Sequence, residues 1–417
     1  MNDREQNDRE TQDDLPLAGI RITDFTWIGA GSFTTKMLAD FGAEVIKIES
    51  AERLDTLRDA APFKDGVRGL NRSGYFADRN TSKKSITVNM KHPDGQALVR
   101  RLVQKSDVIA NNFTPGTMDK FGLGYEAVQA IRPDIIYLAM SMQGDSGPEF
   151  NYLGYGTTIG ALTGLQFLSG LPDRDPAGTG TNYPDHIPNP CHAAFALLAA
   201  LRHRRLTGEG QYIDMAQTEP TIALLGPAVL DWTANQRIAQ RRGNQHLHCS
   251  PHGVYPCKGV DRWIAIAATS NEAWVALCEV LGHPEWTKDE ALNNSATRVI
   301  RSGQIDDRLS QETATWDADE LMAKLQSCNV AAGAVRDVAD LMRRDPQMSH
   351  RGHWVTMDHP EMGPSVYNAP SFRISGVPKG PRSPAPLLGE HNELVLSQIL
   401  GLHADEITAL RKSGALR

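Results

Sequence analysis

The chain has few cysteines, and their spacing indicates neither disulfide pairs nor a metal-binding motif. The five are odd in number, scattered and free of any CxxC pair: Cys191, Cys249, Cys257, Cys278 and Cys328. A disulfide framework needs paired cysteines, and a structural zinc site needs closely spaced thiolates. We therefore expect reduced thiols, a cytoplasmic location and no metal site.

The sequence also lacks long apolar runs and an excess of positive charge. No hydrophobic stretch is long enough to cross a bilayer, and the first residues do not read as a secretory signal. The 43 Lys and Arg against 50 Asp and Glu give a formal net charge of -7, which argues against general nucleic-acid binding. We expect neither a membrane nor a nucleic-acid partner, so any anion site must be a local basic patch.

What the sequence does contain is an alternation of strand and helix patterns. Predicted strands at 20–25 and 44–49 enclose a tight WIGAG turn and a helix over 32–41, with Ser32 as its cap. A second unit has strands at 85–90 and 107–112 around a helix at 93–104, and DIIYLAM predicts a further buried strand. Strand–helix–strand units imply a parallel sheet. The predicted fold class is α/β, with a Rossmann-like parallel sheet in the large domain.

Changes in composition and in the pattern of predicted strands and helices suggest the domain organisation. We expect a disordered polar tail at 1–15, because it has too few apolar residues to offset the entropy of ordering. Residues 16–219 form the first part of the large domain, with 55–79 as a surface excursion. Residues 220–333, with a hairpin pattern at 252–268, form a smaller mixed α+β domain, and 334–417 returns to complete the large one.

The strongest candidate for chemistry lies in the segment YPDHIPNP. It places Asp185 on a proline-stiffened loop just before an apolar helix predicted at 192–205. A carboxylate near the positive end of a helix stays ionised and can attack an activated acyl group. On these residues alone, a helix-capping aspartate is the commoner outcome.

The glycine turn after the first strand has two interpretations. Gly29-Ala30-Gly31, with Glu49 ending the next strand, suggests a dinucleotide site and an oxidoreductase. However, Thr34 stands where that fingerprint requires glycine. A phosphate or pantetheine contact is therefore favoured. Three lysines around the strand at 85–90 are either solvated or phosphate-binding: Lys83, Lys84 and Lys91.

Several long blocks resemble one family. They are LPLAGIRITDFTWIGAGSFTTKMLADFGAEVIKIE, SKKSITVNMKHPDGQALVRRLVQKSDVIANNFTPGTMDKFGLGY, the Asp185 stretch through TGEGQYIDMA, RRGNQHLHCSPHGVYPCKG and APLLGEH. In this order they resemble the class III CoA-transferases from about Pro16 to the carboxyl end. The resemblance implies a Rossmann-like large domain, a small middle domain and two interlocked subunits.

The resemblance also implies a mechanism and a site. An aspartate, here Asp185, attacks an acyl-CoA thioester to form a mixed anhydride, and CoA then returns to give an aspartyl-CoA thioester. The incoming carboxylic acid takes the CoA through a second anhydride. CoA thioesters are substrates, and no tightly bound cofactor is implied. The implied CoA contacts are Gly29, Ala30, Val88, Asn89, Met90, Lys91, Asn112, Phe113, Thr114 and Lys120.

The chain departs from the family pattern in three places. Ser50 replaces a commonly basic residue, with Arg53 as a nearby substitute, and Gly156 replaces the acidic residue of GYD or GYE. RRGNQHLHCSPHG at 241–253 stands in place of the glycine-run loop of the oxalate enzymes. The acid substrate should therefore differ from oxalate.

Alternatives remain at this point. Within the family, TNYPDHIPNPCHAAFALLAALRHRR most resembles subunits of the succinyl-CoA:benzylsuccinate CoA-transferases, which act in anaerobic toluene breakdown. The partner is then an identical or a paralogous chain, and this chain is either the active or a silent subunit.

An α-methylacyl-CoA racemase would need a histidine where Tyr155 stands. A second substrate carboxylate could meet Arg241 or Arg242.

Overall fold

The computed structural model describes residues 15–417. The tail expected at 1–15 lies outside the described residues except for Leu15, which is buried. The chain forms two compact units. The larger holds 15–166, 178–238 and 347–417, and the smaller holds 167–177 and 239–346. The sequence-based bounds of the smaller domain, 220 and 333, differ from these.

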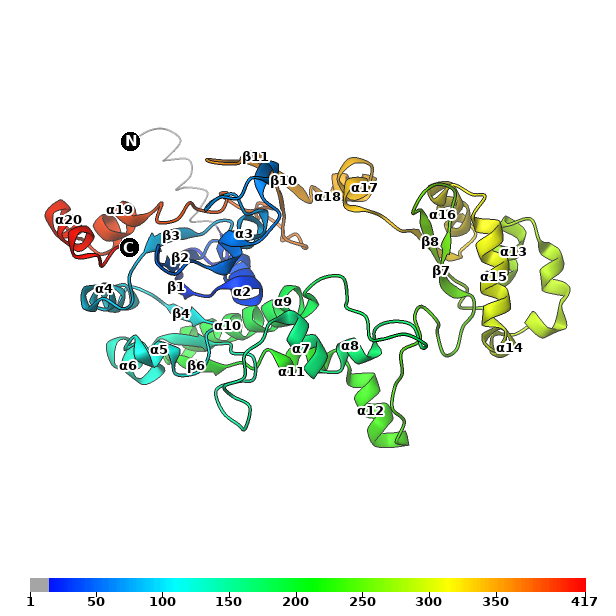
Figure 1. The fold of residues 1–417 in the computed structure, drawn as a ribbon, viewed down its shortest axis with the longest axis horizontal. Helices are drawn as coiled ribbons and strands as arrows, with labels where there is room; N and C mark the ends of the chain where they lie inside the picture. The colour runs from blue at the N-terminus through cyan, green and yellow to red at the C-terminus, as the bar shows by residue number, and fades with distance from the viewer. Residues whose placement is uncertain (1–14) are drawn as a thin grey trace. The chain divides into compact units, whose positions relative to one another are not determined.

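A six-stranded sheet forms the centre of the larger unit (Figure 1). The strand order is β3-β2-β1-β4-β5-β6, and every neighbouring pair is parallel. This order is that of a doubly wound Rossmann sheet, in which the winding reverses between β1 and β4. The predicted α/β class is confirmed. The strands are β1 (Arg21–Phe25), β2 (Glu44–Glu49), β3 (Lys84–Thr87), β4 (Val108–Asn111), β5 (Ile136–Ala139) and β6 (Gln211–Asp214).

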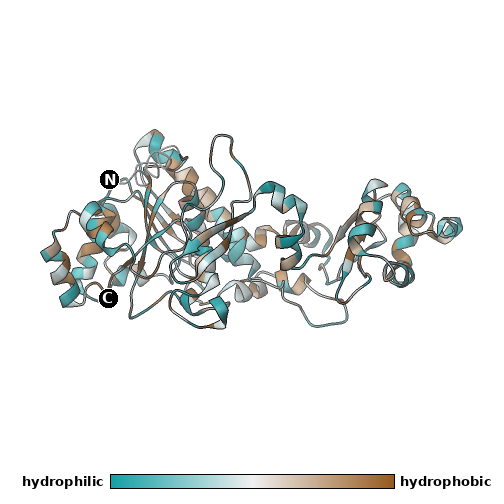
Figure 2. Ribbon diagram, turned by 90° about the horizontal axis from the view of Figure 1, so that it is seen from above, coloured by the Kyte–Doolittle hydropathy of each residue, from teal (hydrophilic) through white to brown (hydrophobic). Residues whose placement is uncertain are grey.

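Helices cover both faces of this sheet, which explains why nearly all residues of the inner strands are buried. One face packs on α2 (Ile28–Asp40) and α10 (Pro188–Thr207). The other packs on α4 (Pro93–Val103), α5 (Thr117–Lys120), α6 (Tyr125–Ile131) and the carboxyl-terminal helices. Those last are α19 (Asn392–Leu394), a π-helical segment (Val395–Ile399) and α20 (Ala404–Ser413). The mixed colouring along the helices in Figure 2 shows that hydrophobic and hydrophilic residues occur together in them.

The start of α2 corrects the predicted turn. The helix begins at Ile28 rather than Ser32, and Ser32 is buried inside it instead of capping it. Gly29 and Gly31 therefore belong to the first helical turns. Trp27 is the N-cap but makes no side-chain cap bond. The amide of Ile28 instead donates to Asp55 Oδ1 at 3.1 Å, a partner that local sequence patterns cannot reveal.

The segment 55–79 is only in part the surface excursion that its composition predicts, because residues 61–70 are mostly exposed whereas the stretches on either side contain buried residues. Asp55 and Arg58 are buried, and Arg58 forms an ion pair with Glu49 at 2.7 Å. The segment contains η1 (Thr56–Asp59), η2 (Lys64–Gly66) and α3 (Gly74–Arg79). Glycine and arginine richness is typical of exposed loops, but here long-range charge pairing draws the chain inward.

The larger unit contains further helices and a second, two-stranded sheet. Residues 372–376 form no strand. The elements are α7 (Gly156–Leu162), α9 (Tyr183–His186), α11 (Thr218–Ala223), α12 (Gly226–Asn235) and the antiparallel pair β10 (Trp354–His359) and β11 (Gly363–Asn368). Two short helices begin in one unit's residues and end in the other's: α8 (Leu165–Leu168) and α18 (Pro346–Arg351).

The smaller unit is a three-stranded antiparallel sheet with helices around its core. The predicted hairpin is present, as β7 (His252–Pro256) and β8 (Trp263–Ala267), and β9 (Ala331–Ala334) pairs with β8. Tyr255 and Trp274 are core residues, whereas Trp263 is 38% exposed. The helices are α13 (Asn271–Val280), η3 (Pro284–Lys288), η4 (Glu290–Leu292), α14 (Ser295–Ile300), α15 (Ser302–Thr313), α16 (Ala318–Ser327) and α17 (Val338–Arg343).

The pairing of β6 with β5 depends on a glycine next to the strand. A Cβ on Gly210 would lie 2.1 Å from Ile135 O, which is rigid backbone. We expect Gly210→Ala to lower the free energy of unfolding by about 1–3 kcal/mol, as measured by urea denaturation. The control is Gly226→Ala, whose added methyl would meet nothing within 4 Å. Equal urea midpoints for the two variants would contradict this account of β6.

Candidate active site

Several of the sequence-predicted site residues follow strands at the carboxyl edge of the parallel sheet, next to the point where its winding reverses. The turn after β1 and the segment after β4 are joined there by the Asn112 side chain. Its Oδ1 accepts from Trp27 N at 2.8 Å, and its Nδ2 donates to Trp27 O at 2.7 Å. The ring of Phe113 packs edge-on against Trp27, with centroids 5.4 Å apart. In doubly wound sheets, this edge is where ligands bind.

Asp185 lies between two glycines, one from each of two helices. It belongs to the short helix α9, and its side chain is buried. A Cβ on Gly29 would come within 2.8 Å of Asp185 Cβ, and a Cβ on Gly156 within 2.8 Å of Asp185 Oδ2. The Gly156 amide donates to Oδ2 at 3.1 Å. Only glycine permits so close an approach at both positions.

Burial raises the pKa of Asp185 to about 6, while the Gly156 amide and the charge of Arg79 act in the opposite direction. The expectation that a helix end simply stabilises the charge is therefore corrected. α10 begins only at Pro188, after Asp185, and loss of solvent outweighs the favourable contacts. The carboxyl group is still mainly ionised at neutral pH.

Three side chains from α3 and α9 form a polar group beside Asp185. His186 Nδ1 lies 3.1 Å from the Arg79 guanidinium, and Nε2 lies 3.4 Å from the Tyr75 hydroxyl. Because guanidinium only donates, Nδ1 must accept and Nε2 carries the proton. Burial lowers the pKa of His186 to about 4, so the ring is neutral. Arg79 was not predicted as a site residue, since it lies in the segment interpreted as surface.

The residues that the resemblance implies as CoA contacts lie in four places. Gly29 and Ala30 are in the first turn of α2, against Asp185 and close to the Trp27–Asn112 bridge. The other three groups follow β3, follow β4 and end α5. They are Val88, Asn89, Met90 and Lys91; Asn112, Phe113 and Thr114; and Lys120. Val88 and Met90 are part of the apolar core, so only their backbone could meet a ligand.

The basic residues considered for phosphates behave differently from one another. Lys83 is buried and paired with Asp24 at 3.1 Å, which excludes it from a phosphate site. Lys84 is paired with Glu44. Lys91 and Lys120 are exposed. The guanidinium of Arg53 stacks over Trp27 at 5.7 Å, next to the α2 turn.

Two cavities differ in their relation to these residues. One of about 280 Å³ adjoins the Asp185 loop, and its lining, which includes Gly156, Thr157 and Pro184, carries no charged side chain. A larger one of about 590 Å³ lies in the smaller unit and contains none of the predicted site residues. Arg241, proposed for a substrate carboxylate, donates to Phe167 O at 2.8 Å within that smaller unit.

The described part of the chain shows neither a metal-binding group of three ligating side chains nor a helix suited to crossing a membrane. Residues 15–417 contain no cluster of three His, Cys, Asp or Glu suited to a metal ion. Among the helices of that same range, none combines the length and hydrophobicity needed to span a bilayer.

Known proteins match the chain over nearly its whole length. Succinate–glutarate CoA-transferase of Agrobacterium fabrum is 33% identical over 390 residues, which cover 92% of this chain and 96% of that protein. Succinyl-CoA–D-citramalate CoA-transferase of Chloroflexus aurantiacus is 30% identical over 95% of this chain and 97% of its own. The beta subunit of succinyl-CoA–L-malate CoA-transferase from that organism is also 30% identical, with the same two coverages.

A solved structure shares the fold as well. A CAIB/BAIF family protein from Brucella suis superposes with a TM-score of 0.84 at 32% identity, covering 92% of this chain and 99% of that one. The profile of the family described as CoA-transferase family III matches residues 17–392. With the Rossmann strand order and an aspartate enclosed by glycines at the ligand-binding edge, these matches establish that the chain belongs to CoA-transferase family III.

Proposed function

We propose that this CoA-transferase moves CoA from succinyl-CoA to a dicarboxylic acid, with Asp185 as the group that is acylated. The observation that carries the proposal is the Asp185 carboxylate, buried between Gly29 and Gly156 at the ligand-binding edge of the sheet. The names of the relatives support the substrates, since they pair succinate or succinyl-CoA with glutarate, D-citramalate or L-malate.

The proposed reaction begins at the free oxygen of Asp185. Among described residues no donor is bonded to Oδ1, whereas Oδ2 is held by the Gly156 amide. Oδ1 attacks the thioester carbonyl of succinyl-CoA and expels the CoA thiolate. The product is a mixed anhydride between succinate and Asp185. The thiolate then attacks the Asp185 carbonyl, which releases succinate and leaves an aspartyl-CoA thioester.

The second half reverses these steps with the acceptor. An acceptor carboxylate attacks the aspartyl thioester, giving a second anhydride and free thiolate. The thiolate attacks the acyl carbonyl of the acceptor, which forms the new acyl-CoA and regenerates Asp185. Each anhydride would be destroyed by water, so the burial of Asp185 protects the intermediates.

CoA would extend from Asp185 along the carboxyl edge of the sheet. Gly29 and Ala30 would offer backbone to pantetheine, and Asn112 to Thr114 would flank it. The exposed Lys91 and Lys120 would meet the phosphates.

Benzylsuccinate fits as an acceptor because it is an aryl-substituted dicarboxylic acid. The interlocked pairing of subunits is part of the same proposal, with an identical or a paralogous chain as the partner.

Asp185 is present, and both glycines that enclose it, Gly29 and Gly156, are present as well. This supports an active rather than a silent subunit. Nothing in the site favours a racemase. Tyr155 is largely exposed, and the nearby His186 is neutral and already engaged by Arg79 and Tyr75.

Replacement of the nucleophile tests the proposal. Asp185→Asn should lose CoA transfer almost completely, since a neutral amide cannot form the anhydride. Wild-type protein mixed with succinyl-CoA and quenched with hydroxylamine should carry its modification on the Asp185 peptide by mass spectrometry. The exposed Asp173→Asn serves as the control. Appreciable turnover by Asp185→Asn would refute the role.

The close approach of Gly156 to Asp185 leads to a separate prediction. Gly156→Ala places a methyl group within 2.8 Å of Asp185 Oδ2, and a displaced nucleophile should lower kcat about 100-fold. Gly160→Ala, in the same helix, adds a methyl only at ordinary contact distance from Gln166. Steady-state kinetics of the two should therefore differ sharply. Equal rates would show that the close approach at Gly156 is unimportant.

The pH dependence follows from the pKa of Asp185. Because the ionised carboxylate is the nucleophile, activity should rise with pH through about 6. Arg79 lowers this pKa, so Arg79→Met should shift the acidic limb of the kcat/KM profile to higher pH. Arg79→Lys keeps the charge and should largely preserve the midpoint. An unchanged profile in Arg79→Met would exclude this electrostatic contribution.

A further inference from the structure

Six charged side chains lie buried together beneath the turn that begins α2, three of each sign. We refer to Asp24, Lys47, Glu49, Asp55, Arg58 and Lys83, each at most 2% exposed, as the buried charge cluster. Its ion pairs are Lys47–Asp55 at 2.9 Å, Lys83–Asp24 at 3.1 Å and Arg58–Glu49 at 2.7 Å. Desolvation largely offsets the attraction within such pairs. Stability alone therefore does not account for the cluster.

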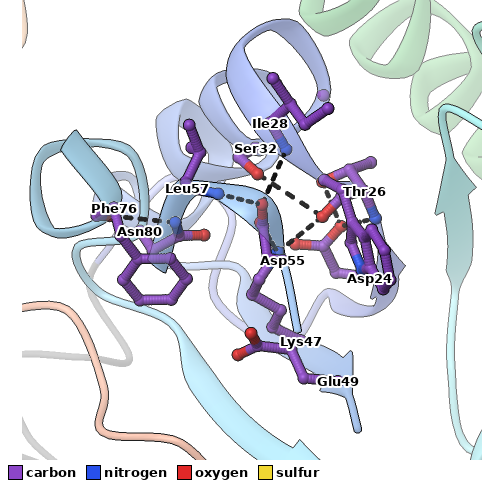
Figure 3. Close-up of polar contacts among 12 residues, drawn as sticks. Asp24, Thr26, Ile28, Ser32, Lys47, Glu49, Asp55, Leu57, Phe76 and Asn80 are labelled. Atoms are coloured by element: carbon purple, nitrogen blue, oxygen red, sulfur yellow. Dashed lines mark hydrogen bonds and ion pairs between the residues drawn. The ribbon is translucent and has the colours of Figure 1, made fainter. Parts of the chain in front are cut away.

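The cluster holds the backbone of the turn Thr26–Ile28 (Figure 3). Lys47 Nζ donates to Thr26 O at 2.6 Å. Asp24 Oδ1 accepts from Thr26 N at 2.9 Å, and Asp55 Oδ1 accepts from Ile28 N at 3.1 Å. Charged donors and acceptors thus fix both ends of the turn, and charge-assisted bonds are stronger than neutral ones.

The turn itself is strained. Ile28 has a φ of 60°, a left-handed conformation that a β-branched residue rarely adopts. Such a residue persists only where its surroundings hold it, and strain of this kind concentrates at functional sites. Asp55 supplies that hold directly, through its bond to the Ile28 amide.

The next residue along the chain meets Asp185. Gly29 approaches so closely that a Cβ would lie 2.8 Å from Asp185 Cβ. Movement of the turn would therefore shift Gly29 relative to the Asp185 carboxylate. We infer that Lys47 and Asp55 are positioning residues of the transferase reaction, which act on Asp185 through the Thr26–Ile28 turn. The inference rests on the proposed role of Asp185.

The ionisation of the cluster is consistent with this role. Burial alone would lower the pKa of Lys47, but the charges of Asp55, Glu49 and Asp24 raise it above its usual value. Burial would likewise raise the pKa of Asp24, and Lys83 and Lys47 bring it below its usual range. Lys47 and Asp24 therefore stay charged where they hold Thr26.

The chain contains a matched control for removing one of these charges. Lys36 and Asp40 form another buried pair, at 2.6 Å, and Asp40 is the last residue of α2, at the opposite end from the turn. Asp40→Asn and Asp55→Asn make the same chemical change, from a buried carboxylate to an amide beside a buried lysine. Both should lower thermal stability, but only Asp55→Asn should affect the reaction.

The test compares single-turnover acylation of Asp185 at saturating succinyl-CoA, per folded molecule. Asp55→Asn should slow acylation about tenfold or more, Lys47→Met should act in the same direction, and Asp40→Asn should match the wild type. Wild-type rates in Asp55→Asn and Lys47→Met would overturn the inference. An equal loss in Asp40→Asn would also overturn it, because the effect would then be general destabilisation.

Amide hydrogen exchange of peptides spanning 26–31 gives a readout independent of the donor. Asp55→Asn should speed exchange there, and Asp40→Asn should not. Unchanged exchange in Asp55→Asn would overturn the positioning inference. If the wild type is not acylated at all, the proposed function fails instead, and exchange alone decides whether the cluster fixes the turn.

Discussion

The site depends on the close approach of a buried carboxylate to backbone. Asp185 contacts Gly29 of α2 and Gly156 of α7 at distances that leave no room for a Cβ. Removal from water raises its pKa to about 6, a value at which it is mainly ionised at neutral pH yet poorly solvated. A poorly solvated carboxylate is a stronger nucleophile, and the same burial keeps water from an anhydride. This single constraint supports the acylation proposed for Asp185.

The rest of the larger unit serves to hold that contact. The Rossmann strand order brings the turn after β1 and the segment after β4 together at one edge, where Asn112 bonds both backbone atoms of Trp27. Beneath them, the buried charge cluster fixes Thr26 and Ile28. Arg79 and His186 lie on the α3 and α9 side of Asp185 and bring one cationic charge to it. Positioning and electrostatics therefore come from different elements.

The sequence predicted the α/β class, five of the six parallel strands and the hairpin of the smaller unit, because those depend on local periodicity. It pointed to Asp185 through proline spacing and family resemblance, and its role stays a prediction. The start of α2, the burial of Asp55 and Arg58, the pairing of Lys83 and the presence of Arg79 beside Asp185 were missed. Each is decided by partners far along the chain, such as Asp55 for the Ile28 amide, which composition does not reveal. β6 is short and half exposed, so its pattern is weak.

The most direct test of the central claim follows oxygen atoms. An acceptor acid whose carboxylate carries ¹⁸O attacks the aspartyl thioester, and after the thiolate attacks the acyl carbonyl, that oxygen stays on Asp185. Turnover with succinyl-CoA and a labelled dicarboxylic acid should therefore place ¹⁸O in the Asp185 peptide and in no other, as read by mass spectrometry. Product formed without heavy oxygen in that peptide would contradict covalent catalysis by Asp185.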